Sequence, residues 1–192
     1  MVTRSSPAPR FAIDARGRAN LARQVRSPNF DARPAETRVT LIVVHGISLP
    51  PGKFGGDAII RLFTNRLDPA GHPYYATIAG LRVSAHFLIR RDGALLQFVS
   101  CDDRAWHAGA SSWQGRERCN DFSIGVELEG ADDVPYASAQ YAVLARLIKA
   151  LSRRYPIAGV AGHSDIAPGR KTDPGEAFDW HRLRRLIAPR RR

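Results

Sequence analysis

The sequence predicts a single α/β domain in which a mixed central β-sheet is flanked by helices. Three stretches carry this prediction: residues 39–44 form an apolar run of strand length, residues 122–130 alternate between apolar and polar side chains, and residues 136–155 repeat apolar side chains at helical spacing. Strands that alternate with helices along a chain are typical of α/β proteins. The 192 residues suffice for one well-buried domain and are too few for two.

The N-terminal half is expected to contain a strand, a helix and a hairpin. The β-branched run at 39–44 is typical of a strand covered on both faces, and it ends at His45 before a loop rich in proline and glycine. Residues 56–67 place apolar side chains at helical spacing, whereas prolines and glycines break residues 67–81 into an expected surface loop. Residues 83–100 predict a β-hairpin that turns at an Asp-Gly pair.

The C-terminal half is expected to add a strand, a long helix, a short strand and a closing helix. The alternation at 122–130 predicts two strand faces, one with Phe122, Ile124, Val126 and Leu128 and the other with Ser123, Gly125, Glu127 and Glu129. The long helix should begin near Ser138 and end before Pro156. A short strand from residue 157 leads into a polar loop, and residues 179–187 should form a helix capped by Asp179.

The positive charge of the chain is concentrated at its ends. The net charge is +11, but residues 1–38 hold eight Arg against three acidic residues and residues 178–192 hold six Arg against one Asp, so the middle is almost neutral. The sequence has no basic stripe interleaved with aromatic residues, and we therefore expect no nucleic-acid partner. The expected boundaries are a basic N-terminal extension at 1–25, the domain at 26–187 and a basic tail at 188–192.

The sequence also indicates the cellular compartment in which the protein is expected. The first residues carry charges without the apolar stretch of a signal peptide, and no run of about 18 apolar residues is present. Cys101 and Cys119 are too few for a disulfide framework, which is typical of a reducing compartment. We expect a cytoplasmic monomer without a membrane partner.

Three side chains are candidates for a metal site. His45 ends the first predicted strand, His163 follows the last one, and Asp173 lies ten residues further on. Two imidazoles and one carboxylate leave a fourth position for water, as in catalytic zinc sites. The spacing alone is not diagnostic, because Asp165 is a competing ligand in the same loop.

Four blocks of sequence resemble the zinc-dependent N-acetylmuramoyl-L-alanine amidase family. They are "VVHGISLPPGKFGG", "LRVSAHFLIRRDG", "RAWHAGASSWQGRERCNDFSIGVELEG" and "GHSDIAPGRKTDPGEAFDW", and they follow one another over residues 26–180. The resemblance implies that one Zn²⁺ is held by His45, His163 and Asp173. It also leads us to expect Asn after the first ligand, where this chain has Gly46.

The resemblance implies two further residues in the chemistry. Glu127 would be the carboxylate that moves protons, and Lys171 would be the cation beside the developing negative charge. Glu129 remains an alternative to Glu127, because the alternation of the strand places both on one face.

Other residues are candidates for contacts with substrate. Arg82 and Arg118 could pair with substrate carboxylates, since a guanidinium binds a carboxylate bidentately. Trp106 and His107 could form a wall of the sugar site or anchor their loop. His86 is expected to be a core histidine with one bonded nitrogen.

The reaction that the resemblance implies is hydrolysis of the amide between N-acetylmuramic acid, in its 1,6-anhydro form, and L-alanine. The partner would be a small muropeptide in cytoplasmic cell-wall recycling. The alternatives are a peptidoglycan-binding module without activity and a phage-type lysin that acts on polymeric peptidoglycan.

Overall fold

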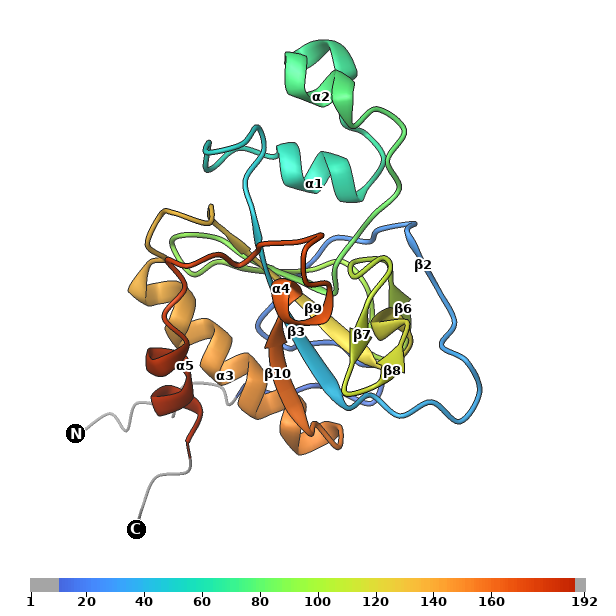
Figure 1. Cartoon of the computed structure of the whole chain (residues 1–192). Coiled ribbons are helices and arrows are strands. Elements are labelled where there is room, and N and C mark those ends of the chain that lie inside the picture. The colour runs from blue at the N-terminus through green and yellow to red at the C-terminus, as the bar shows by residue number, and fades with distance from the viewer. Residues whose placement is uncertain (1–10, 189–192) are drawn as a thin grey trace, which may run out of the picture.

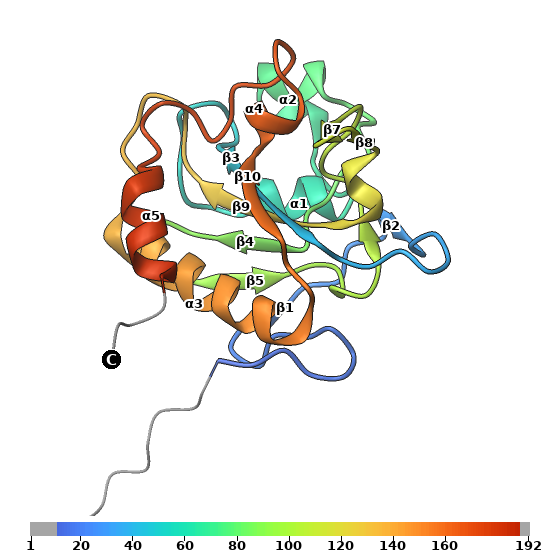
Figure 2. The same ribbon diagram turned by 60° about the horizontal axis from the view of Figure 1, so that its bottom comes forward.

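The centre of the fold is a six-stranded, mostly parallel β-sheet. The computed structural model describes residues 11–188 (Figure 1). In spatial order the strands are β1 (Arg23–Gln24), β5 (Leu95–Gln97), β4 (Phe87–Ile89), β9 (Ser123–Glu129), β3 (Leu41–Ile47) and β10 (Gly159–Gly162), as Figure 2 shows. Within this sheet β4 and β5 are antiparallel and the other neighbours are parallel. The prediction of an α/β fold with a mixed sheet is confirmed.

Helices cover both faces of the sheet. The long helix α3 (Ser138–Arg154) and α5 (Trp180–Ile187) lie on one side, and α1 (Ala58–Phe63) packs on the other side against β4 and β5. The remaining elements are short: β2 (Phe30–Asp31), α2 (Pro73–Thr77), β6 (Arg104–Ala105), β7 (Ser112–Trp113), β8 (Arg116–Glu117), α4 (His163–Ile166) and two 3₁₀ turns at Pro69–Gly71 and Cys119–Asp121. Among residues 11–188, no helix is long and apolar enough to cross a bilayer.

The two faces of β3 belong to two different parts of the core. Ile42 and Val44 pack with the apolar stripe of α3, while Leu41 and Val43 pack under α4 on the opposite face. Because side chains alternate along a strand, His45 continues the face of Leu41 and Val43 at the carboxyl end of β3. The sheet therefore presents His45 at an edge that loops surround.

Most of the predicted elements are confirmed. The hairpin turns at Gly93, whose φ of +88° suits glycine, and its strands β4 and β5 pair antiparallel. The long helix begins at Ser138, and the closing helix begins after Asp179, whose carboxylate accepts the Arg182 N–H at 2.7 Å.

Two predicted elements differ from the structure. The helix expected over 56–67 is only α1, because Asn65 adopts a φ of +57° just after the helix and ends it. The segment 67–81, expected as a loop, contains a 3₁₀ turn and α2. The side chains of Asp68 and His72 cap these two elements by accepting backbone N–H groups.

The expected boundary at residue 25 does not separate an extension from the domain. Phe11 and Ala19 are buried in the core cluster of α3, and β1 pairs with β5. The Phe11 carbonyl also accepts a hydrogen bond from Arg153 at 2.6 Å. Residues 11–25 are thus part of the folded body, and the last helix, α5, ends at Ile187. Residues 1–10 and 189–192 lie outside the described residues.

We expect Gly130→Ala to lower the free energy of unfolding by about 1–3 kcal/mol, because overpacking a buried site strains it. A Cβ at Gly130 would collide with the buried Tyr136 ring. The matched control is Gly71→Ala, whose Cβ would lie 3.5 Å from the nearest atom of Tyr75. Urea unfolding should show a loss only for the first variant, and equal stabilities would contradict the packing described here.

Candidate metal centre and active site

Three side chains from three segments meet at the carboxyl edge of the sheet. His45 comes from the end of β3, His163 directly follows β10, and Asp173 comes from the loop after α4. The Nδ1 atoms of the two histidines are 3.0 Å apart, and each lies 3.1 Å from Asp173 Oδ2. The three candidate ligands predicted from sequence are therefore brought together.

The donor set fits a divalent cation. The carbonyl of Ala108 lies 3.2 Å from His163 Nε2 and can only accept, so this nitrogen carries the proton of the neutral ring and Nδ1 presents a lone pair. Burial lowers the pKa of His45 to about 4, which keeps its imidazole neutral and suited to bind a metal. Two imidazole nitrogens and a carboxylate oxygen are typical ligands of catalytic zinc.

Glu127 lies beside this cluster because of strand register. His45 on β3 is the direct partner of Glu127 on the parallel strand β9. The carboxyl is almost fully buried, and its Oε2 has no hydrogen-bond partner among the described residues. Burial, together with the nearby charge of Asp173, raises the pKa of Glu127 well above its usual range. An unpartnered buried carboxyl of this kind is suited to exchange protons with a ligand.

Lys171 lines the same pocket from the exposed loop that carries Asp173. Its backbone N–H donates to the Ala167 carbonyl at 3.0 Å, which fixes the start of the loop against the end of α4. The positive charge of Lys171 opposes the rise in the pKa of Glu127. Lysine and ligand are thus held by one loop two residues apart.

Glu129, the alternative to Glu127, and Asp165, the competing metal ligand, both lie away from the cluster of His45, His163 and Asp173. The carboxylate of Glu129 accepts the backbone N–H groups of Gly55 at 2.7 Å and Arg91 at 3.2 Å, so it holds loops together. The carboxylate of Asp165 accepts the Gly162 N–H at 2.7 Å and caps α4. Neither residue lines the pocket of the three candidate ligands.

His86 is a core histidine, as expected, but both of its ring nitrogens are hydrogen-bonded, where the prediction had one. It is fully buried, and its Nδ1 accepts the Gly125 N–H at 3.0 Å. Its Nε2 therefore carries the proton and lies 3.1 Å from the Asp103 carbonyl.

Of the four residues expected to contact substrate, one lines the pocket and three do not. His107 lines the pocket, with Nδ1 2.9 Å from His45 Nε2. Trp106, Arg82 and Arg118 do not line it. Arg82 is exposed next to the pocket residues Leu81 and Val83, and Arg118 forms an ion pair with Asp121 at 3.3 Å.

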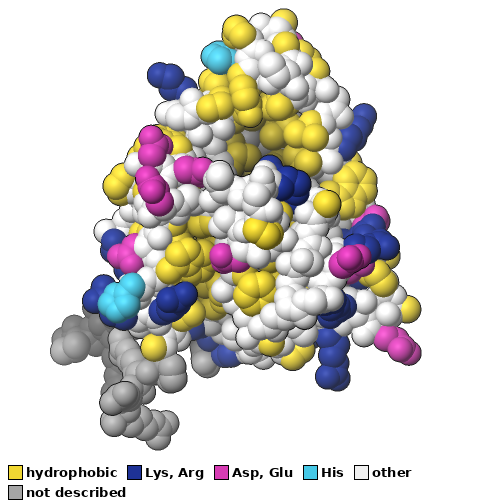
Figure 3. Space-filling view, in the orientation of Figure 1, with side chains coloured by type: hydrophobic (Ala, Val, Ile, Leu, Met, Phe, Trp, Pro, Cys, Tyr) yellow, Lys and Arg dark blue, Asp and Glu magenta, His cyan; other side chains and the backbone are white. Residues whose placement is uncertain are grey.

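The pocket has a volume of about 420 Å³ and one apolar wall that the sequence analysis did not predict. This wall comes from the segment of α1 and α2, whose pocket residues are Leu62, Phe63, Tyr74, Ile78 and Leu81. In Figure 3, apolar side chains gather beneath α2 at the top of the molecule. Tyr74, Ile78 and Leu81 belong to segment 67–81, which the sequence predicts as a surface loop without a role in a pocket.

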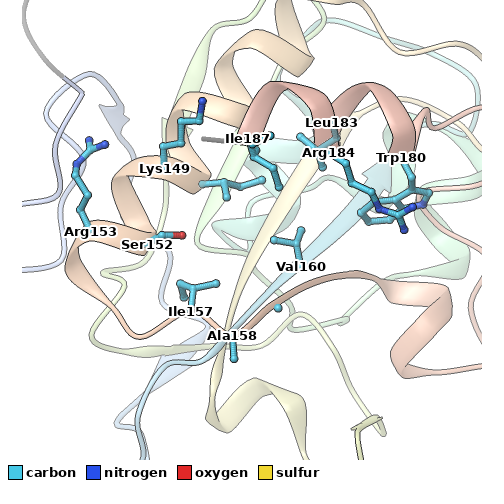
Figure 4. Close-up of a pocket in the computed structure, with 13 residues that line it drawn as sticks. Lys149, Ser152, Arg153, Ile157, Ala158, Val160, Trp180, Leu183, Arg184 and Ile187 are labelled. Carbon is cyan, nitrogen blue, oxygen red and sulfur yellow. The ribbon is translucent and has the colours of Figure 1, made fainter. Parts of the chain in front are cut away.

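A larger groove lies elsewhere, between α3, α5 and β10 (Figure 4). It measures about 710 Å³, and Trp180, Leu183 and Ile187 of α5 form one side. None of its lining residues is His, Cys, Asp or Glu, so it lacks the side chains that usually bind a metal. The smaller pocket is therefore the candidate site.

Gly46 leaves room for the side chain of Tyr136 beside the candidate ligands. A Cβ at this position would collide with the hydroxyl of Tyr136, which donates to the Pro174 carbonyl at 2.9 Å. Pro174 follows Asp173, so Tyr136 connects the end of β3 to the loop of the third candidate ligand.

Comparison with known proteins agrees with this site. The family model for N-acetylmuramoyl-L-alanine amidase matches residues 35–176, and the chain belongs to this family of amide hydrolases. It is 60% identical over 170 residues to the 1,6-anhydro-N-acetylmuramyl-L-alanine amidase AmpD of Citrobacter freundii, which covers 88% of this chain and 91% of the relative.

Two solved structures are similar as well. A crystal structure of a selenomethionine derivative of AmpD superposes with a TM-score of 0.88 at 59% identity and covers 90% of this chain and 98% of its own. The amidase AmiD of Escherichia coli, in complex with anhydro-N-acetylmuramic acid-L-Ala-D-γ-Glu-L-Lys, has a TM-score of 0.56 at 32% identity. That match covers 81% of this chain and 60% of AmiD.

We expect His45→Ala to lose binding of an added divalent metal, with Zn²⁺ as the probe, while the far-UV circular dichroism stays unchanged, because the variant removes one of three candidate ligands and leaves β3 intact. Asp165→Asn is the matched control, since an amide oxygen can still accept the Gly162 N–H. Zinc content after dialysis measures both. Zinc retained by His45→Ala would contradict the ligand set.

Proposed function

We propose that the chain uses one zinc ion to hydrolyse the amide between 1,6-anhydro-N-acetylmuramic acid and L-alanine in small muropeptides, as a cytoplasmic step of cell-wall recycling. The observation that carries the chemistry is the register that pairs His45 with Glu127 at the edge where His163 and Asp173 converge. The choice of substrate rests on the 60% identity to a relative named for the anhydro form.

His45, His163 and Asp173 would hold the metal. When bound, zinc supplies a Lewis acid that lowers the pKa of a water ligand toward about 7 and polarises a carbonyl group. The neutral imidazoles suit this role because their protons sit on the nitrogens that face the protein, as the Ala108 carbonyl requires for His163.

Glu127 acts as the general base and then as the general acid. Its unpartnered Oε2 accepts a proton from the attacking water, and the same carboxyl delivers that proton to the nitrogen of the departing L-alanine. The first step needs the ionised carboxylate, which the charge of Lys171 favours and a bound cation would favour further. The rise in the pKa of Glu127 caused by burial favours the second step, since the carboxyl must hold the proton until the amide bond breaks.

Lys171 stabilises the negative charge that develops on the scissile carbonyl oxygen. Its place on the loop of Asp173 keeps the ammonium group at the pocket. Arg82, Arg118 and Trp106 remain candidates for contacts with the peptide or sugar further from the reacting bond, and the apolar wall of α1 and α2 supplies surface for the lactyl and sugar portions.

The residues present at the site favour an enzyme over a binding module. All three ligand positions are occupied by ligand residues, and Glu127 and Lys171 line the same pocket. A lysin acting on polymeric peptidoglycan shares this chemistry and differs in substrate, so the substrate must be tested directly.

Glu127→Gln should lower kcat by about 10²–10⁴, the usual contribution of general acid–base catalysis, and should leave zinc content unchanged. The matched control is Glu129→Gln on the same face of β9, which should keep most of the turnover because Glu129 does not line the pocket and its carboxylate accepts from the loop backbone of Gly55 and Arg91. Peptide release followed by mass spectrometry measures both. Equal losses in the two variants would contradict the assignment of Glu127.

The substrate is tested by offering 1,6-anhydro-N-acetylmuramoyl tripeptide beside polymeric peptidoglycan, with chelator and with added zinc. We expect release of tripeptide that the chelator blocks and zinc restores, and little release from the polymer. Faster cleavage of the polymer would favour the lysin. Bound zinc with no cleavage of either substrate would favour the binding module.

A further inference from the structure

We infer that His107 is a positioning residue for the metal site: its ring fixes the tautomer of His45, so that Nδ1 of His45 is the nitrogen left free for the metal. This inference rests on the proposed zinc site. Of the two roles considered for His107, a wall of the sugar site or an anchor within the protein, the inference supports the second. His107 contacts a candidate metal ligand, not the metal itself.

The tautomer of His107 follows from two hydrogen bonds whose donors are fixed by chemistry. The Cys119 carbonyl can only accept, and Ser123 Oγ lies 2.5 Å from it, so the hydroxyl proton of Ser123 points there. His107 Nε2 lies 3.2 Å from the same Oγ and must therefore be the donor. The proton of the neutral His107 ring is thus on Nε2.

The opposite nitrogen of His107 then has only a lone pair. His107 Nδ1 lies 2.9 Å from His45 Nε2, and this contact is a hydrogen bond only when His45 donates. The proton of His45 is consequently on Nε2, and its Nδ1 turns a lone pair toward His163 Nδ1 and Asp173 Oδ2. The two imidazole rings meet edge to face, with an interplanar angle of 86°.

The position of the His107 ring is itself built into the fold. A Cβ at Gly125 would lie 2.5 Å from Cγ of His107, so the ring occupies space that only glycine leaves on this face of β9. The Asn120 amide oxygen accepts the backbone N–H groups of His107 at 3.1 Å and Ala108 at 2.8 Å. The ring has little freedom to turn or leave.

The same two residues orient both metal histidines. The His107 side chain accepts from His45, and the adjoining Ala108 carbonyl accepts from His163 at 3.2 Å. Each contact places the ring proton on Nε2 and frees Nδ1. Partners of this kind commonly change metal affinity by about 10- to 100-fold when removed.

Two substitutions at His107 separate the nitrogens. Asn places its amide oxygen near the position of Nδ1 and keeps the acceptor for His45, while Gln reaches the position of Nε2 and loses that acceptor. We expect His107→Gln to weaken zinc binding by about 10- to 100-fold, and His107→Asn to restore most of the affinity. Competition with a chromophoric chelator measures the affinity, and the exposed His181→Gln is the control.

Kinetics distinguish positioning from a sugar contact. If His107 only touched substrate, His107→Gln would raise KM while zinc affinity stayed as in the unmodified protein, and that result would overturn the inference. The positioning role instead predicts that saturating zinc restores part of the lost kcat in the Gln variant, with little change in KM.

The tautomers are read directly from the metal-free protein by long-range ¹H–¹⁵N correlation of the imidazole rings. We expect the Nε2–H form for both His45 and His107, and a proton on Nδ1 of His45 would overturn the inference. This spectrum does not depend on zinc binding. If the unmodified protein bound no zinc, the proposed function would fail while the tautomer would still be measured.

Discussion

The parallel pairing of β3 with β9 is the interaction on which the site depends. It places His45 next to Glu127 through backbone hydrogen bonds, without requiring the two side chains to attract one another. Burial lowers the pKa of His45 to about 4 and raises the pKa of Glu127, so the register holds both side chains where their charged forms are costly. The central position of both strands in the sheet supplies the rigidity that holds them there.

The other groups reach this edge from segments that the sheet already orders. β10 lies on the far side of β3 and delivers His163, and the loop after α4 returns Asp173 and Lys171 to the same place. Behind His45, the segment of His107 packs on β9 where Gly125 has no side chain. The functional groups thus lie at the carboxyl ends of parallel strands, where ligand sites of open α/β sheets generally form.

The sequence was a good guide to whatever depends on local patterns. The periodicity of the α3 segment and the β-branched run of β3 predict their elements, and the Asp-Gly turn predicts the hairpin. Residues 11–25 were misjudged because their apolar side chains, such as Phe11 and Ala19, are isolated in the sequence and find the core only through tertiary contacts.

The sequence predicts the three candidate ligands that the structure brings together, but not the groups that hydrogen-bond to them. Alternation cannot separate Glu127 from Glu129, since both lie on one face, and the distinction comes from backbone N–H groups of Gly55 and Arg91 that the sequence does not place near β9. The role of His107 depends on where the Ser123 hydroxyl points, which no spacing rule reveals. Candidate ligands can be recognised in the sequence by their residue type, whereas the groups that hydrogen-bond to them become neighbours only in the folded chain.

The pocket joins two parts of different character. The candidate metal ligands and Glu127 belong to the sheet edge and its loops, whereas the apolar wall comes from α1, α2 and their connections, which lie between β3 and β4 in the chain. His45 and Glu127 lie on β3 and β9, outside that inserted segment. If the proposed roles hold, the shape of the wall can diverge over evolution while the candidate ligands and Glu127 stay constant, and the inserted segment is the part of the chain to redesign for a different substrate.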